Sequence, residues 1–310
     1  MRRIPFICIN IFSNKIKAAF FCSFLLLQAS AQQNENIHDT GTLANITVTA
    51  FSSQSKWKDA AASVAVLNKY SLQRFDNNSM VTALNSVTGV RMEERSPGSY
   101  RLSLRGSLLR SPFGVRNVKV YWDDIPLTDA TGNTYLQLLD INTLQGIQIV
   151  KGPAASYYGA NTGGTVLLES DTHFSADKNI FNAGLSGGSF GLLNEQLAWK
   201  YSGKKFISNL QQGHVQSNGY RQNSALRRDM IRWNGLLNLN DKEQLSFLAF
   251  YSNLHYETPG GITKAQMDSL PILARQPTPT LPGAVQQKAG VYNETIFAGV
   301  SLKSVLSKSI

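Results

Sequence analysis

The C-terminal part of the chain alternates apolar and polar residues over long segments. Leu197, Trp199 and Tyr201 share one face of a predicted strand, and Ile231 and Trp233 share one face of another. This period of two is that of a β-strand, whose successive side chains point to opposite faces. Most of the segments are much longer than the roughly 5–6 residues of a strand in a globular protein. The pattern predicts six strands, at residues 180–188, 191–202, 205–217, 228–240, 243–256 and 291–303.

The turns between these strands alternate in length. Residues 202–204 and 240–242 are tight turns, whereas 217–228 and 256–290 are long. Aromatic residues lie near the strand ends. Short turns on one side and long loops on the other are typical of an outer-membrane β-barrel. A soluble β-sandwich also alternates, so it stays open as an alternative on this pattern alone.

The number of strands is small for a membrane barrel. Single-chain barrels have at least about 8 strands, and a lumen that holds a domain takes about 22. Residues 304–310 resemble the middle of a strand rather than its end. We therefore expect residues 171–310 to be the first strands of an incomplete barrel, and the chain to be a fragment of a longer protein.

Residues 1–31 have the features of a signal peptide. A basic start is followed by the apolar run 18–27 and by the small residues 29–31, which predicts cleavage after Ala31. The apolar run is about half of the roughly 20 residues that a spanning helix needs, and an uncleaved anchor is the alternative. Cleavage removes Cys8 and Cys22, so the mature chain has no disulfide and no thiolate metal site.

The charge of the chain does not indicate nucleic-acid binding. The formal net charge is +10, but Arg2, Arg3, Lys15 and Lys17 lie in the signal peptide and their removal lowers it to +6. No dense basic run remains, so we predict no nucleic-acid partner.

The histidines do not indicate catalysis or metal binding. His38, His173, His214 and His255 are spread along the chain, and none has the spacing of a metal site or a catalytic triad. We predict no enzyme, no metal site and no cofactor.

Residues 56–170 alternate short apolar runs with Gly, Pro, Asn and Asp turns, as in a compact α+β domain. A helix is predicted over 80–87, with Asn78 or Ser79 as N-cap and Gly89 as its C-terminal stop. Further extended runs are predicted at residues 100–104, 118–122 and 146–150.

The segment before this domain, residues 32–55, is polar and predicted to be flexible. It contains one uncharged, β-favouring island of five residues, namely Ile46, Thr47, Val48, Thr49 and Ala50. Such an island can add as an extra strand to the edge of a partner's sheet. The alternative is that it forms the first strand of the following domain.

Residues 43–170 resemble the N-terminal plug of TonB-dependent outer-membrane receptors, and 46–50 look like the TonB box. Residues 256–262 are similar to ferric-siderophore and ferric-citrate-type receptors. Asp124 stands where this family usually has Gly, so we expect Asn/Asp-type left-handed geometry in that turn. The other motifs that carry the resemblance occur in the family's order, at residues 84–90, 104–106, 120–126, 147–153 and 156–168.

The resemblance implies an α+β plug domain inside a transmembrane antiparallel β-barrel of about 22 strands. It implies a receptor in the outer membrane of a Gram-negative bacterium, in contact with outer-membrane lipid. The receptor would import a ferric chelate, a siderophore or ferric citrate, by energy-coupled plug rearrangement, with a TonB-type inner-membrane protein pulling on the TonB box. Importers of haem, a metal complex, cobalamin, a peptide or a glycan, or an exported structural or adhesive β-protein, are the alternatives.

Counting chain reversals places candidate ligand contacts. The turn 96–99 and the loop 128–135 are expected on one side of the plug, and the loop 107–116 on the other. Family precedent puts the first side outward, facing the ligand. Arginine suits an anionic chelate because its fork binds carboxylates bidentately, although each candidate could be only a solvated turn residue. The candidates are Arg91, Arg95, Tyr100, Asp129, Asn133 and Tyr135.

Arg105 and three glycines are assigned structural roles in the plug. Arg105 lies between Leu104 and Gly106, so we expect it to be partly buried and to need a carboxylate or wall carbonyls as partners. Glu93, Glu94 and Glu169 are its possible plug partners. Gly106, Gly152 and Gly159 are expected to permit tight turns and backbone packing.

Overall fold

The structure is a computed structural model, and the residues it describes all belong to the second of two units, Met1–Asn45 and Ile46–Ile310. The predicted signal peptide, most of 32–55, and residues 75–78, 97, 108–113 and 173–177 lie outside the described residues. The described ranges are 47–48, 55–56, 62–74, 79–96, 98–107, 114–152, 155–159, 163–172 and 178–305, with the backbone alone at 47–48, 55–56 and 155–156.

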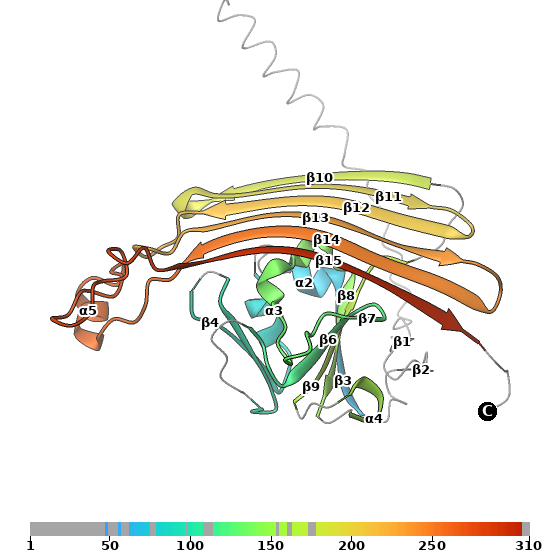
Figure 1. The fold of residues 1–310 in the computed structure, drawn as a ribbon, viewed down its shortest axis with the longest axis horizontal. Coiled ribbons are helices and arrows are strands. Elements are labelled where there is room, and N and C mark those ends of the chain that lie inside the picture. The colour runs from blue at the N-terminus through green and yellow to red at the C-terminus, as the bar shows by residue number, and fades with distance from the viewer. Residues whose placement is uncertain are drawn as a thin grey trace, which may run out of the picture. The chain divides into compact units, whose positions relative to one another are not determined.

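Six long antiparallel strands form one curved sheet, here called the long sheet (Figure 1). Each strand pairs with the next one in sequence, which confirms the six predicted strands to within two residues at each end. The strands are β10 (Lys178–Gly188), β11 (Leu192–Ser202), β12 (Phe206–Ser217), β13 (Leu226–Asn238), β14 (Glu243–Glu257) and β15 (Gly290–Ser304).

The outer face of the long sheet carries a row of apolar side chains. The register places Phe181, Trp199, Leu210, Trp233 and Ala249 side by side on five neighbouring strands. Phe181 is 76% exposed and Trp233 is 49% exposed. Large apolar groups at such exposure need a covering medium other than water. The period-two pattern of the sequence thus has a physical cause in two faces with different surroundings.

The two long loops lie at the same end of the long sheet and are bonded to each other. Arg221, in the loop before β13, donates to the carbonyls of Leu273 (2.7 Å) and Gly260 (2.9 Å) in the loop before β15. Asn223 donates to the carbonyls of Thr258 and Ala289. The second loop contains the short helix α5 (Lys264–Ser269). We call this the long-loop end of the sheet.

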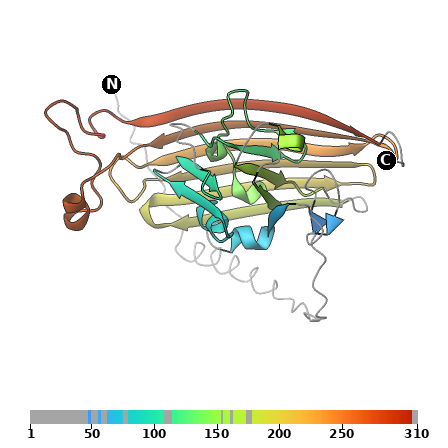
Figure 2. The same cartoon turned by 90° about the horizontal axis from the view of Figure 1, so that it is seen from below.

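A compact α+β domain lies against the inner, concave face of the long sheet (Figures 1 and 2). Its five-stranded sheet has the order β3-β8-β9-β6-β7, and β4 pairs separately with β5. The strands are β3 (Ser63–Asn68), β4 (Val90–Glu94), β5 (Tyr100–Leu104), β6 (Val118–Trp122), β7 (Ile125–Pro126), β8 (Gly146–Lys151) and β9 (Gly164–Glu169). The helices are α2 (Lys69–Gln73), α3 (Val81–Asn85) and α4 (Ala155–Tyr158), with 3-10 turns η3 (Leu136–Leu138) and η4 (Ile141–Thr143).

The predicted helix at 80–87 is present as α3, shorter than expected. Its N-cap residue is Met80, and not Asn78 or Ser79 as predicted. Asn78 lies outside the described residues, and the Ser79 hydroxyl accepts a hydrogen bond from the Val81 amide at 3.3 Å. Asn85 bonds both backbone groups of Met92, at 2.9 and 2.7 Å, and so ties the helix to β4. The helix ends at Asn85 with Ser86 as its C-cap, and Gly89, the predicted stop, lies four residues beyond Asn85 with φ +75°.

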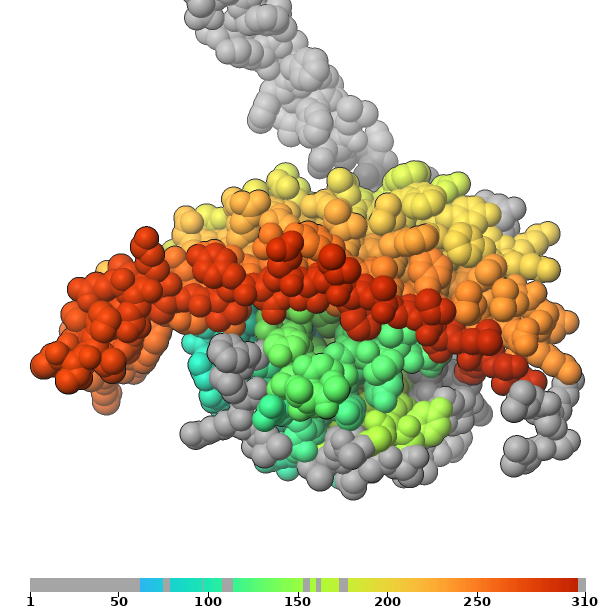
Figure 3. Space-filling view, viewed as in Figure 1, coloured from blue at the N-terminus to red at the C-terminus, as the bar shows by residue number. Residues whose placement is uncertain are grey.

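The core of the α+β domain is completed by the long sheet. Trp122 on β6 is fully buried and donates to the Ser170 hydroxyl at 2.8 Å. Met230, Leu248 and Phe250, from β13 and β14, belong to the same buried cluster as the core of the domain. In the space-filling view the strands from yellow to red lie directly on the green domain (Figure 3). The two parts therefore share one hydrophobic core.

The turn between β6 and β7 has the left-handed geometry that was expected in it. The residue that adopts this geometry is Asp123, with φ +51°, and not its neighbour Asp124. The Asp123 amide donates to the Leu168 carbonyl at 2.8 Å, and its carboxylate accepts from the Ser170 amide at 2.9 Å. These bonds to the end of β9 hold the residue in that conformation.

In the described part of the chain, no helix is long and apolar enough to cross a membrane.

We expect Gly164→Ala to destabilise the α+β domain. Gly164 has φ +137°, and a Cβ there would lie 2.3 Å from the Val150 carbonyl oxygen, so strain at this backbone position should cost about 1–3 kcal/mol. The measurement is the urea midpoint at which the domain becomes sensitive to protease in the purified natural protein. Gly184→Ala is the control, because the nearest atom to its Cβ lies at 3.8 Å. Equal midpoints for the two variants would contradict the argument.

Candidate functional site

The hairpin turn between β4 and β5 lies against the long-loop end of β14. Tyr256 is buried there, and a Cβ on Gly98 would approach its ring to 3.1 Å. Ser99 hydrogen-bonds to the Tyr256 hydroxyl. Gly98 has φ +78°, so glycine meets both the conformation and the close approach. Tyr256 therefore fixes the position of the predicted ligand turn.

The loop 128–135 does not follow the predicted count of reversals. Val115 and Thr134 exchange backbone hydrogen bonds of 2.8 and 2.9 Å, so this loop lies beside the end of the 107–116 loop. The count was wrong because it missed β7, which reverses the chain after Trp122. Residues 108–113 themselves lie outside the described residues.

Tyr135 nevertheless lies near the turn 95–99. It packs against the buried cluster of Leu138, Leu254 and Tyr256, and Tyr256 is the residue that contacts Gly98. One predicted ligand segment thus contacts Tyr256, and the other packs against the cluster to which Tyr256 belongs, although for a different topological reason than expected.

Two of the predicted ligand residues hold their own loop. The Asp129 carboxylate accepts from the amides of Thr131 and Asn133, both at 2.9 Å. Desolvation would raise the pKa of Asp129, but hydrogen bonds from Thr131, Asn133 and Gly132 outweigh it and keep the pKa below its ordinary value. The side-chain amide oxygen of Asn133 accepts a hydrogen bond from Arg116 Nε at 2.7 Å. Asp129 and Asn133 therefore shape the loop.

The other predicted residues differ in exposure. Arg91 is exposed and pairs with Glu93 at 2.7 Å. Tyr100 is half-buried against the domain core. Arg95 is exposed, and its positive charge is close enough to interact electrostatically with the Tyr256 hydroxyl. Arg95 is thus the best-placed cation of the predicted set to meet an external ligand.

The expected burial of Arg105 is wrong. Arg105 is exposed and has φ +51°, because β5 ends at Leu104 and the chain turns at Arg105 and Gly106. Its proposed partners are engaged elsewhere, since Glu94 accepts from the Gly98 amide and Glu169 from Gln148. No ion pair of Arg105 occurs among the described residues. Gly106, Gly152 and Gly159 all have positive φ, of +78°, +103° and +79°.

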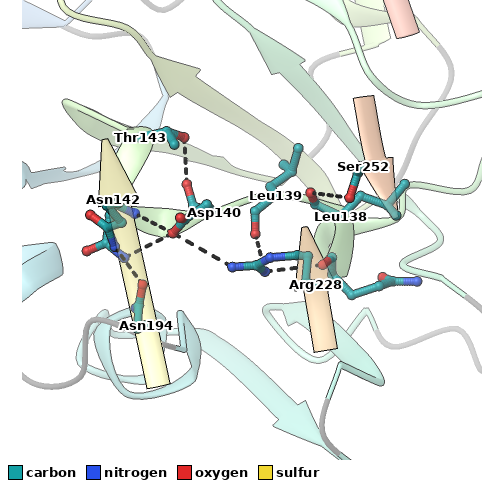
Figure 4. Close-up of polar contacts among 10 residues, drawn as sticks. Leu138, Leu139, Asp140, Asn142, Thr143, Asn194, Arg228 and Ser252 are labelled. Atoms are coloured by element: carbon teal, nitrogen blue, oxygen red, sulfur yellow. Dashed lines mark hydrogen bonds and ion pairs between the residues drawn. The ribbon is translucent and has the colours of Figure 1, made fainter. Parts of the chain in front are cut away.

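The segment that carries η3 and η4 lies between the domain core and the inner face of the long sheet (Figure 4). Asp140 is its buried N-cap residue, and its carboxylate accepts from the Asn142 amide at 3.0 Å. A Cβ on Gly213 of β12 would lie 2.8 Å from this carboxylate. The glycine therefore lets the carboxylate approach the long sheet closely.

Arg228 of β13 reaches into this segment (Figure 4). Its guanidinium donates to the carbonyls of Leu139 (2.6 Å) and Gln137 (3.3 Å) and lies 3.7 Å from the Asp140 carboxylate. Arg228 is 8% exposed. From β14, the Ser252 hydroxyl donates to the Leu138 carbonyl at 3.3 Å. The long sheet thus satisfies backbone carbonyls that the short 3-10 turns leave free.

Arg232, four residues further along β13, is 2% exposed. Its guanidinium lies over the Trp122 ring, 4.6 Å from the centroid, and donates to the Thr143 carbonyl at 3.1 Å and to Gln211. Its Nε and Nη1 have no hydrogen-bond partner among the described residues. Burial raises the pKa of the Asp123 carboxyl, and hydrogen bonds from Ser170 and the charge of Arg232 oppose that rise.

The sequence argument did not assign a role to Asp140, Arg228, Arg232 or Tyr256. A partial signal was present, because Arg232 falls on the polar face opposite Ile231 and Trp233. A charged residue in the middle of an inward face needs a partner, but nothing in the pattern identifies η3 and η4 as that partner.

The predicted TonB box is described only at Thr47 and Val48. These residues form β1 (Thr47–Val48), which pairs antiparallel with β2 (Ser55–Lys56). This pair is separate from the five-stranded sheet of the domain. The described part of the island is thus extended, but it is not a strand of that sheet. No group of His, Cys, Asp or Glu side chains suited to a metal ion occurs in the ranges that the structure describes.

A domain packed on the inner face of a curved antiparallel sheet was the expected arrangement. The sequence model of the family "TonB-dependent Receptor Plug Domain" matches residues 56–166. Residues 56–166 are a TonB-dependent receptor plug domain. The resemblance seen in the sequence is confirmed, and the α+β domain is called the plug from here on.

Solved structures share the fold of the plug and the long sheet together. The ferric citrate transporter FecA in its unliganded form is 18% identical, with a TM-score of 0.65 over 86% of this chain and 40% of its own. P. aeruginosa FpvA bound to heterologous pyoverdines is 14% identical, with a TM-score of 0.57 over 81% of this chain and 32% of its own. The copper transporter OprC is 16% identical, with a TM-score of 0.54 over 65% of this chain and 32% of its own.

This chain therefore matches two fifths or less of the length of each of these structures. The similarity places the chain in the fold of the N-terminal portion of such receptors. The three proteins carry different cargoes by their names, so the shared fold does not identify a ligand.

We expect Arg228→Met to loosen the plug from the long sheet. The change removes the two carbonyl bonds and leaves the buried Asp140 carboxylate without its cation, which should cost about 3 kcal/mol of docking free energy. The measurement is the urea concentration at which protease cleaves the plug of the purified natural protein. Arg227→Met is the control, because Arg227 is exposed on the outer face of the same strand. If both variants behave alike, Arg228 does not hold the plug.

Proposed function

We propose that this chain belongs to a TonB-dependent outer-membrane receptor that imports a ferric chelate by energy-coupled rearrangement of the plug. In this proposal the protein is exported through a cleaved signal peptide, lies in the outer membrane of a Gram-negative bacterium and binds a TonB-type inner-membrane protein through residues 46–50. The observation that carries the proposal is the plug itself, docked by buried polar contacts on a sheet with an apolar outer face.

The two faces of the long sheet support a membrane location. A band of exposed apolar side chains, with Phe181 and Trp233 among them, suits the hydrocarbon of a bilayer. The inner face is covered by the plug, whose removal would leave a polar surface suited to a water-filled lumen. An importer of a bulky solute needs both properties.

The contacts between the plug and the long-loop end of the sheet support ligand capture at that end. Gly98 approaches Tyr256, and Tyr135 packs against the buried cluster that contains Tyr256. Tyr256 lies on β14, the strand that leads into the loop 258–289. A ligand held at this point would contact the plug and the long sheet together. Its binding energy could then shift the population of plug conformations.

Val48→Pro should abolish uptake and leave ligand binding at the cell surface intact. Proline removes an N–H donor and fixes φ, so strand addition to the energy-coupling protein should fail. The measurement is uptake of radiolabelled ferric citrate and ferric siderophores by a deletion strain that carries the natural gene or the variant.

Ser55→Pro is the matched control, because it disrupts the β1–β2 pair from its other strand and leaves 46–50 unchanged. Normal uptake with Val48→Pro would refute the assignment of the TonB box. Equal loss with both variants would assign the effect to the β1–β2 pair instead.

Arg95→Ala and Tyr135→Phe should each weaken ligand binding. Loss of a hydrogen bond to a charged chelate should cost about 1–3 kcal/mol. The measurement is equilibrium binding of the chelate that supports uptake, on cells depleted of energy so that transport does not contribute. Arg227→Ala, on the exposed outer face, is the control. Unchanged affinity in both variants would show that other parts of the receptor hold the ligand.

A further inference from the structure

The charged residues of the long sheet are sorted by sign between its two faces. Pairing registers show which strand residues share the face that carries Arg228 and Arg232. All the charged residues on this inner face of β10–β15 are basic, and no acidic residue occurs there. They are Lys178, Lys200, Arg228, Arg232 and Lys303.

The carboxylates of the same strands lie on the outer face. Arg227 is the only Lys or Arg of these strands that shares this face with them, and it pairs with Asp229 at 2.9 Å. His214 and His255 also lie on the outer face, and His214 contacts Asp229 at 2.6 Å. The acidic residues of the outer face are Glu195, Asp229, Glu243, Glu257 and Glu294. The inner face therefore attracts anions, and the carboxylates of its own strands do not offset that attraction.

The carboxylates that lie close to the basic residues of the inner face come from outside the long sheet. Asp140 lies 3.7 Å from Arg228, and Asp123 is close enough to Arg232 for their charges to interact. Asp171, directly after the plug, pairs with Lys200 at 2.6 Å. If the segment 136–143 leaves the long sheet, Arg228 loses the Asp140 carboxylate and two backbone carbonyls, and Arg232 loses the Thr143 carbonyl. Asp123 lies in the turn between β6 and β7, outside this segment.

Arg228 and Arg232 form a pair of buried arginines on the inner face of the long sheet. They are four residues apart on one face, which corresponds to about 13 Å along the strand. The described residues of the plug leave Nε and Nη1 of Arg232 without a hydrogen bond although the side chain is buried. A ligand with two or more carboxylates could give both guanidinium groups the oxygen partners that they lose.

We propose that Arg228 and Arg232 form a second, internal binding site for polycarboxylate anions, which opens when the plug segment 136–143 leaves the wall. The inference rests on the proposed function and adds a cargo class, an anionic chelate rich in carboxylates. The plug carboxylates and the cargo compete for the same two arginines. An anion that binds only the open state must shift the plug equilibrium toward that state.

The test measures this shift directly in the purified natural protein, with citrate as the probe. The fraction of protein in the open state is followed through the rate of protease cleavage within the plug. This rate is measured at one fixed, mildly destabilising urea concentration. Citrate is compared with chloride at equal ionic strength. We expect citrate to raise the open fraction, by about tenfold when its concentration is ten times its Kd for the open state.

Variants assign the effect to the wall. The quantity compared is the ratio of the open fraction in citrate to the open fraction in chloride. Because this ratio is measured within each variant, it does not depend on the basal stability of that variant. In the double variant Arg228→Gln/Arg232→Gln the ratio should fall to about one. Arg227→Gln, on the outer face, should keep the ratio of the unchanged protein. If the double variant does not fold, Arg232→Lys keeps the charge but loses the fork, and its ratio should be reduced.

An unchanged ratio in the double variant, or in Arg232→Lys when that variant replaces it, would overturn the proposal. Absence of a citrate effect in the unchanged protein would also overturn it. A second readout separates this proposal from the proposed function: Arg232→Gln should slow chelate uptake by cells without changing binding to energy-depleted cells. If the unchanged protein imports no ferric chelate, the proposed function fails, while the citrate response still decides the internal site.

Discussion

A guanidinium group keeps its charge at every physiological pH, so an arginine buried in a protein must find oxygen or aromatic partners. Arg228 and Arg232 are buried on the inner face of β13, and the plug supplies those partners at Leu139, Asp140 and Thr143. This requirement explains why η3 and η4 lie on the inner face of the long sheet, since these two short turns offer backbone carbonyls that the arginines can bond. It also brings the neighbouring residue Tyr135 toward Tyr256.

The long sheet separates two environments by chemistry. Its outer face presents apolar side chains in register and carries the carboxylates of the strands, whereas its inner face carries only basic charge. A domain docked on such a face must neutralise it, and the plug does so with Asp140 and Asp123, aided by Asp171 in the following segment. The same charges that hold the plug would attract an anion once the plug moves, so docking and transport would use one surface.

Much of the fold could be predicted because its signals are local. Alternation in strands such as 228–240 reflects side chains that point to opposite faces, and the helix at 80–87 followed from its apolar spacing and Gly89. Two predictions failed where the outcome depends on distant residues. The side of the loop 128–135 was set by a short reversal at β7. Arg105 is exposed because β5 ends at Leu104 and Arg105 lies in the left-handed turn that follows.

The sequence by itself determined the class of the fold, the positions of the six long strands and the presence of a plug, because periodicity and motif order are properties of neighbouring residues. Only the tertiary structure decided which plug residues meet the wall. Asp140 and Arg228 are far apart in sequence, and neither carries a local pattern that names the other. Their contact depends on the curvature of the long sheet and on Gly213, which leaves room for the carboxylate. Such proximity is a property of packing, and it appears only when the two parts of the chain share one core.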